Sequence, residues 1–150
     1  MGAIAYLLEW KKFMTILQVG ALPLRKSRGG FEILLISSRE TGRWVIPKGW
    51  PSKRLSDPNA AAREAKQEAG VTGKISGEPI GSYRYRKRTG EDIRVLTVNC
   101  YILWVKKERK RWREQDQRTR VWFSQDDAVK KVREPGLKAL IASLQGRPKN

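Results

Sequence analysis

One segment near the middle of the chain carries the clearest helix signal, and it limits the folds that the whole chain can adopt. Asp57 followed by Pro58 is typical of a helix start, with an acidic N-cap and a proline at the first helical position. Helix formers fill residues 60–69, and Gly70 is suited to a C-cap. Because strand-like runs lie on both sides of this helix, the sequence predicts a mixed α/β domain.

The runs on both sides of the helix have the length and apolar content of strands. Before it we expect strands at residues 13–24, 31–37 and 44–46. After it we expect strands at residues 80–87, 93–105 and 121–123, with a charged loop at 106–120. The run at 93–105 is apolar on both faces, which favours a central position in the sheet. A short helix capped by Ser124 and a last helix should close the fold, the last one with an apolar face formed by Leu137, Leu140, Ile141 and Leu144.

The charge of the chain narrows the class of partner. Thirty-two Lys and Arg against 15 Asp and Glu leave a formal net charge of +17, which attracts anionic ligands at long range. Nucleic acid, an acidic membrane surface and a polyphosphorylated small molecule all fit this charge, and so does a basic surface without a dedicated ligand. The apolar run at 3–8 is too short to span a membrane, and Lys11 and Lys12 follow it instead of preceding it. We therefore expect a cytoplasmic protein that does not use a membrane.

The chain has no histidine and one cysteine, Cys100. This excludes an intrachain disulfide, Ser-His or Cys-His catalysis, and histidine zinc sites. Cys100 lies in an apolar strand-like run and is expected to be a small buried side chain. Chemistry must then rest on carboxylates, Lys, Tyr or a metal bound by oxygen.

Glu64 and Glu68 are the strongest candidates for that chemistry. They are four residues apart on the predicted helix and therefore project from one face. Two carboxylates on a rigid helix can bind Mg²⁺ and leave positions for water and phosphate oxygens. The alternative is a solvated helix face on which Arg63, Glu64, Lys66 and Glu68 form i,i+4 pairs.

Residues 49–71 resemble the Nudix box, G-x5-E-x7-R-E-U-x-E-E-x-G-U, in which U is aliphatic. Gly49, Arg63, Glu64, Glu68 and Gly70 match five of its seven fixed positions, and Val71 matches the last aliphatic one. Leu55 and Gln67 stand where the box has Glu. The resemblance implies one Nudix hydrolase domain over residues 1–150, with 1–12 as an N-terminal extension. It also implies an α/β/α sandwich with a mixed central sheet.

Other parts of the chain look like the diphosphoinositol polyphosphate phosphohydrolase branch of that family. In that branch, the residues that match Ser37, Ser38 and Arg39 contact the polyphosphate, and Arg25 is similarly placed. The resemblance further implies that metal binds to Glu64, Glu68 and the main-chain carbonyl of Lys48, with Mg²⁺ (or Mn²⁺) as the cofactor. The predicted substrate is a polyphosphorylated small molecule.

The basic loop at 106–120 holds the next candidates. Glu114 follows Trp112 in a Trp-x-Glu arrangement like that of relatives, and is expected to serve as a metal ligand or general base. Arg118 and Arg120 are predicted to add phosphate contacts. An alternative is that Glu114 and Asp116 only moderate a cationic loop.

The function predicted from these residues is metal-dependent hydrolysis of a phosphoanhydride in a diphosphoinositol polyphosphate or a dinucleoside polyphosphate. The catalytic set would be Glu64, Glu68, Gln67 and Glu114. The amide of Gln67 adds no negative charge and cannot accept a proton as a carboxylate does. One alternative is therefore a Nudix-fold protein that binds polyphosphates or RNA with weakened catalysis, and another is an RNA-directed pyrophosphohydrolase.

Overall fold

The computed structural model describes residues 16–145, so the predicted N-terminal extension at 1–12 lies outside the described residues. Strands and helices alternate as the sequence predicts. In chain order the elements are β1 Ile16–Ser27, β2 Gly30–Ser37, β3 Trp44–Val45, β4 Lys48–Gly49, α2 Asp57–Glu64, η1 Ala65–Ala69, β5 Val71–Ile75, β6 Gly81–Thr89, β7 Asp92–Glu108, β8 Arg120–Ser124, α3 Gln125–Lys131 and α4 Pro135–Ser143.

The strands form one mixed sheet around β7. This strand pairs in parallel with β1 and antiparallel with both β5 and β6, while β2 pairs antiparallel with β1, β3 and β8. The side chains of β7 are buried on both faces of the sheet. Leu103 lies in the core that α2 covers, and Val98 lies in the core on the opposite face. The predicted central position of this strand is confirmed.

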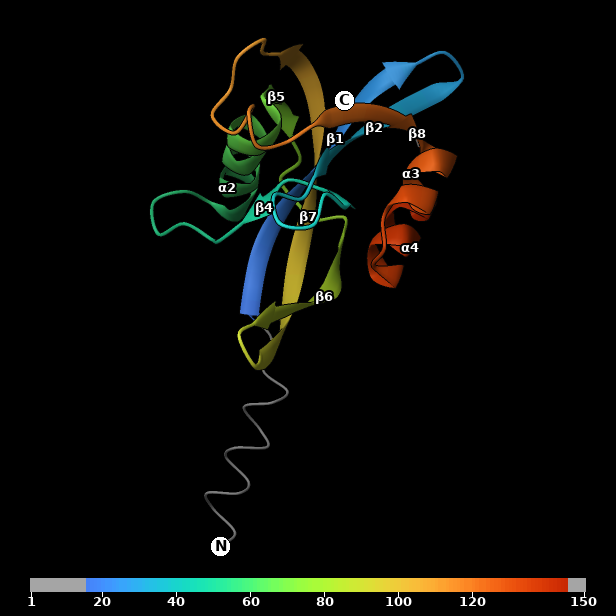
Figure 1. Cartoon of the computed structure of the whole chain (residues 1–150). Coiled ribbons are helices and arrows are strands. Elements are labelled where there is room, and N and C mark those ends of the chain that lie inside the picture. Colours follow the sequence, from blue (N-terminus) through green and yellow to red (C-terminus); the bar gives the residue numbers. More distant parts are fainter. Residues whose placement is uncertain (1–15, 146–150) are drawn as a thin grey trace, which may run out of the picture.

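Helices cover both faces of the sheet (Figure 1). On one face, alanines of α2 and η1 pack against Val19, Leu34 and Leu103, where the absence of larger side chains lets the helix lie close to the strands. On the other face, α3 and α4 bury Leu137 and Ile141 against β1, β2 and β6. The predicted α/β/α sandwich is therefore confirmed. None of the helices at residues 16–145 is both long and apolar enough to cross a membrane.

The central helix has the predicted C-cap but a different N-cap. The N-cap is Ser56, not Asp57, and its hydroxyl accepts a hydrogen bond from the Asn59 main-chain N–H at 3.4 Å. A serine cap leaves Asp57 free to place its charge in the first turn, where it favours the helix dipole. The predicted C-cap is confirmed, because Gly70 has the left-handed conformation with φ 68°.

The last turn of this helix widens from α to π over Ala65–Ala69. The Gly70 N–H accordingly donates to the carbonyls of Ala65 and Lys66. Single π-turns inside α-helices are frequent at functional sites. Here the widened turn carries Glu68, whereas Glu64 ends the regular α-helical part.

Two further differences concern the strands after the helix. Residues 71–75 form β5, which the sequence did not predict, and β7 runs on to Glu108 and shortens the expected loop. The two extensions pair with each other, because β5 is antiparallel to the end of β7. The predicted cap at Ser124 is confirmed by a hydrogen bond from the Asp127 N–H at 3.1 Å.

Candidate active site

Glu68 lies at the centre of a buried polar cluster between η1 and β4. Its side chain is 10% exposed. Its Oε1 atom accepts a hydrogen bond from the Lys48 main-chain N–H at 3.3 Å and lies 3.6 Å from Nη2 of Arg118. The carboxylate is therefore fixed from two sides, as a metal ligand or a base must be.

Glu64 is held against the backbone of β4. A methyl group added at Gly49 would collide with the Glu64 carboxylate, so only glycine lets this side chain take its position. The short strand β4 itself is anchored on β1, with Val19 opposite Gly49. The motif therefore needs glycine at position 49, because any larger residue would displace the Glu64 carboxylate.

Gly49→Ala should displace the Glu64 carboxylate and lower turnover by about 10²-fold, because misplacing a reacting group by about 1 Å costs that much. Gly77→Ala is the matched control, since no atom lies within 4 Å of the added methyl. Rates and melting temperatures of both variants would be compared. Equal rates in the two variants would show that the position of Glu64 does not matter.

The loop at 109–119 brings Glu114 to the same cluster. The Glu114 main-chain N–H donates to the carbonyl of Gln67 at 3.1 Å, and the Trp112 indole donates to the carbonyl of Glu68 at 3.2 Å. Both bonds tie the loop to the last turn of the helix. The structure therefore brings together the helix acids and the loop acid that the sequence places far apart.

Arg118 joins these acids instead of facing an open phosphate site. Its Nε donates to Oε1 of Glu114 at 2.9 Å, its Nη1 donates to the carbonyl of Ser37 at 3.2 Å, and its Nη2 faces Glu68. Only 9% of its side chain is exposed. In this structure the predicted phosphate ligand is a counter-cation inside the carboxylate cluster, a role that its position in the sequence does not reveal.

The predicted residues of the loop after β2 lie at the rim of the cluster. Arg39 is half exposed, its Nε lies 3.7 Å from Oε1 of Glu114, and its Nη1 donates to Oε1 of Gln117 at 3.1 Å. The Ser37 hydroxyl accepts from the Thr119 N–H at 2.8 Å. Ser38 starts the turn that exposes Arg39, since its N–H donates to the carbonyl of Arg43 at 2.6 Å. Gln117 was not among the predicted residues.

Arg120 is engaged elsewhere. Its guanidinium donates to the main-chain carbonyls of Ala69, Gly70 and Arg109 and stacks on the Trp112 ring at 3.9 Å. These contacts close the C-terminus of the helix and hold the loop in place. Arg120 therefore has a structural role in this arrangement, and its predicted phosphate contact stays a prediction.

Arg25 is also apart from the cluster. It pairs with Glu32 at 2.8 Å and with Glu108 at 3.6 Å, and its guanidinium lies 4.3 Å from the Trp122 ring centre. Within residues 16–145 none of its ion pairs reaches the three acids of the site. Its predicted contact with substrate stays a prediction.

Burial sets the electrostatics of the cluster. It raises the pKa of Glu68 from 4.5 to about 7, against the stabilising field of Arg118, and Glu64 and Glu114 raise that pKa further. Burial raises the pKa of Glu64 as well. It lowers the pKa of the Lys48 ammonium, which the Glu68 charge partly opposes. A group of acids that resists ionisation in this way is one that a cation would stabilise.

The raised pKa of Glu68 predicts how stability depends on pH without metal. The folded chain holds this proton up to about pH 7, whereas the unfolded chain releases it near 4.5. The contribution of Glu68 to the free energy of unfolding is therefore full below pH 4.5 and lost as the pH rises towards 7. Denaturant titrations in EDTA should show a steeper loss for the wild type than for Glu68→Gln. Parallel curves would contradict the assigned pKa.

The residues present fit a divalent cation only with help from other oxygens. No three acidic side chains in the described part of the chain stand close enough to hold a metal by themselves. Glu64 and Glu68 offer carboxylate oxygens on one side of the cluster, where Gly49 keeps the space clear. Mg²⁺ usually binds one or two carboxylates and fills its shell with water and phosphate oxygens. The two carboxylates fit that pattern, and the Lys48 main-chain carbonyl stays a predicted third oxygen.

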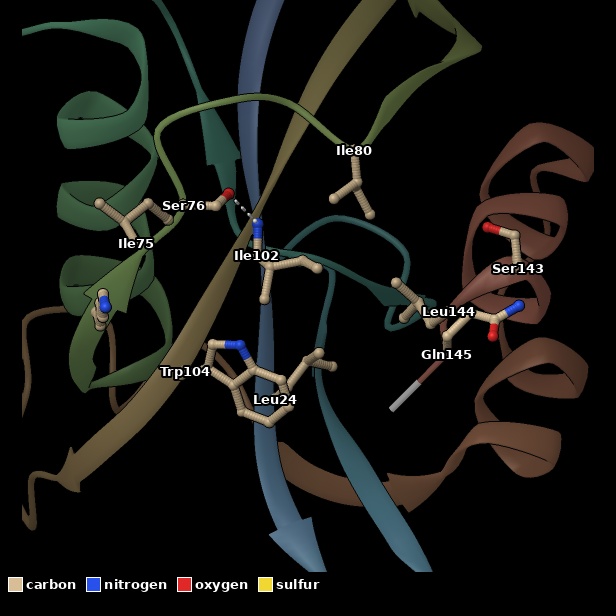
Figure 2. A pocket seen from close by; sticks show the side chains of 10 residues that line it. Leu24, Ile75, Ser76, Ile80, Ile102, Trp104, Ser143, Leu144 and Gln145 are labelled. Carbon is tan, nitrogen blue, oxygen red and sulfur yellow. Dashed lines mark hydrogen bonds between the residues drawn. The ribbon is translucent and has the colours of Figure 1, made fainter. Parts of the chain in front are cut away.

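A separate apolar pocket of about 670 Å³ lies on the other face of the sheet (Figure 2). Its lining includes Leu24, Ile102 and Trp104 from β1 and β7 and Leu144 after α4. None of the acids described above takes part in it. Its chemistry does not suit a phosphate, so it is not the candidate active site.

Known proteins resemble this chain over most of its length. A model of the NUDIX domain matches residues 14–144. "Nudix hydrolase 16, mitochondrial" of Arabidopsis thaliana is 35% identical over 71% of this chain and 61% of its own length. Human diphosphoinositol polyphosphate phosphohydrolase 3-alpha is 31% identical over 75% of this chain and 66% of its own length. The chain spans 54% to 61% of the length of the first three Arabidopsis relatives.

Solved structures share the fold at lower identity. An Ap4A hydrolase binary complex from C. elegans has a TM-score of 0.63 at 21% identity, over 85% of this chain and 93% of that one. A MutT protein from Bacillus halodurans has a TM-score of 0.63 at 18% identity, over 87% and 84%. At these identities the likeness concerns the arrangement of the sheet and helices.

Proposed function

Because this chain belongs to the NUDIX family, we propose that it hydrolyses a phosphoanhydride bond in a polyanionic substrate with the help of a divalent metal ion. The observation that carries the proposal is the pair Glu64 and Glu68, held at the end of one helix beside Glu114 from a distant loop. The named activities of the human relative and of the C. elegans neighbour support the choice of bond.

In this proposal Glu64, Glu68 and the Lys48 carbonyl would hold Mg²⁺ or Mn²⁺. The ion supplies Lewis acidity and neutralises phosphate charge when it is bound. Glu68 is kept in place by the Lys48 N–H. Glu114 would accept a proton from the attacking water, and its main-chain bond to Gln67 supports this role because it holds the residue beside the helix acids.

The substrate phosphates would lie beside Arg39 and Ser38, at the edge of the carboxylate cluster. Arg39 is half exposed and has an end of its guanidinium available beyond its contacts with Glu114 and Gln117. Ser38 stands next to it at the start of the same turn. An arginine fork suits phosphate oxygens, and the net charge of +17 speeds the encounter with a polyanion. A diphosphoinositol polyphosphate or a dinucleoside polyphosphate meets these requirements.

The test is a measurement of phosphate release with Mg²⁺ and with Mn²⁺ on three substrate classes: diphosphoinositol phosphates, dinucleoside polyphosphates and 5′-triphosphorylated RNA. We expect metal-dependent turnover of one of the first two classes. Turnover of the triphosphorylated RNA alone would replace the proposed substrate. No turnover of any substrate with either metal would overturn the proposed function.

Gln67 supports one other candidate function, a binding protein with weakened catalysis. It stands in the last turn beside Glu68, where a carboxylate would add charge and a base, and its amide does neither. Gln67→Glu should raise turnover by about tenfold or more if the site is a catalyst short of one carboxylate. Ligand binding without turnover in both forms would favour the binding protein.

A further inference from the structure

A row of three arginines lies on the exposed side of β6, apart from the carboxylate cluster. Arg84, Arg86 and Arg88 alternate along the strand, so their side chains point to one face of the sheet. All three are exposed, whereas Tyr83, which points to the opposite face of the strand, is buried against α4. Figure 1 shows that the hairpin of β6 and β7 extends from the end of the sheet below the helices.

The register of the sheet places apolar side chains beside this row. Arg84 lies opposite Thr97 of β7, and Thr97 lies opposite Leu17 of β1. Arg88 lies opposite Ile93. Residues directly opposite one another share a face, so the three arginines, Leu17 and Ile93 form one continuous surface. We name this surface the arginine face.

The arginine face has two properties that folding does not require: exposed aliphatic side chains and arginines without an ion pair in residues 16–145. Leu17 is 53% exposed and Ile93 is 55% exposed, although both are large and apolar. Within residues 16–145 none of the three arginines makes an ion pair. Charge on an edge strand does discourage pairing between copies, but that does not account for the aliphatic side chains beside it.

The shape of the surface selects among anionic partners. Neighbouring arginines in the row are about 6.8 Å apart along the strand, a repeat that suits successive phosphates of an extended chain. Sheet surfaces bind single strands by pairing phosphates with cations and by stacking bases on aromatic rings or guanidinium planes. Bases taken out of a stack also pack against apolar side chains. A membrane is a poorer fit, because the hairpin tip that would enter it carries Glu91 and Asp92.

We infer that the arginine face binds single-stranded nucleic acid, with phosphates on Arg84, Arg86 and Arg88 and bases against Leu17 and Ile93. The inference does not require hydrolysis, since the surface shares no residue with Glu64, Glu68 and Glu114. RNA and DNA single strands both have the required chemistry, and the experiment separates them.

The test uses fluorescence anisotropy with labelled oligo(U) and oligo(dT) of about 12 nucleotides on the full chain, over a range of salt concentrations. The test variant changes Arg84, Arg86 and Arg88 to Gln. We expect at least tenfold weaker binding and a salt slope lower by about 2, since each lost phosphate contact removes about 0.7 on a single strand. The control variant changes Lys26, Arg28 and Lys130 to Gln, which are exposed elsewhere and give the same net charge.

Equal weakening by the two variants would mean that net charge alone attracts the strand, and would overturn the inference. If the triple variant does not fold, Arg86→Gln alone replaces it. This variant should lower the slope of log affinity against log salt by about 0.7. Ile93→Thr should weaken oligonucleotide binding but leave the binding of inorganic polyphosphate unchanged, because only the former has bases.

Binding to vesicles of anionic lipid without binding to either oligonucleotide would also overturn the inference. Glu68→Gln should bind oligonucleotides like the wild type. That variant separates failure of this surface from failure of the proposed hydrolysis.

Discussion

Glu68→Gln should lower phosphoanhydride turnover by about 10²–10³-fold while leaving the fold intact. The amide retains the size of the side chain and can still accept the Lys48 N–H, but it brings no charge to a metal ion or to the attacking water. Steady-state rates at saturating Mg²⁺ and Mn²⁺, with circular dichroism spectra of both proteins, measure the effect.

The matched control is Glu78→Gln, which removes an exposed carboxylate from the turn after β5. It should keep the wild-type rate. A Glu68→Gln protein with the wild-type rate would refute the metal role of the helix acids, whereas equal losses in both variants would point to a general effect of charge.

The central helix was predictable because its signals are local. A proline at its start, a run of alanines and a glycine at its end act within a few residues of one another, and the structure places the helix there. The prediction missed by one residue at the N-cap, since Ser56 and Asp57 are both good caps and only the geometry of the turn chooses between them.

The central strand was predictable for a similar reason. Apolar side chains at both alternations of β7 require burial on two faces, and only an interior strand provides that. By contrast, β5 has one glycine and two polar residues among its five positions, so its pairing with the end of β7 is decided by the partner strand. Local propensity does not contain that information.

The arrangement of the site was predictable only in part. Glu64, Glu68 and Glu114 were chosen from motif spacing, and the fold brings them to one cluster. The positions of Arg118 and Arg120 depend on contacts across about fifty residues, such as that of Arg120 with the carbonyl of Ala69. A sequence does not show how buried an arginine is or which main-chain carbonyls it contacts, so it predicts phosphate contacts for both Arg118 and Arg120.

Arg118 gives the cluster a cation of its own. Its guanidinium bridges Glu68 and Glu114, and all three side chains are at most 16% exposed. Buried carboxylates without a partner are costly, so a cation must balance them in the metal-free protein. A dication bound to Glu68 would take over that balance and compete with the 3.6 Å contact to Arg118. The released guanidinium would then be available to a phosphate, which is the contact that the sequence predicts for it.

Arg118→Gln should therefore lower the free energy of unfolding by about 2–3 kcal/mol in EDTA, because it leaves the buried Glu68 without its counter-cation and Glu114 with only the exposed Arg39. Saturating Mn²⁺ should restore most of that loss and raise the melting temperature of the variant more than that of the wild type. Titration calorimetry should show tighter Mn²⁺ binding by the variant, since no guanidinium has to be displaced.

Arg39→Gln is the matched control, because Arg39 approaches the same Glu114 oxygen at 3.7 Å but is 56% exposed. An exposed pair contributes at most about 1 kcal/mol, so this variant should unfold like the wild type and bind Mn²⁺ with the same affinity. If Arg118→Gln behaved like Arg39→Gln in EDTA and in Mn²⁺, the guanidinium would not be the counter-cation of the cluster. The acids would then be balanced by solvent alone, and metal would enter without displacing a side chain.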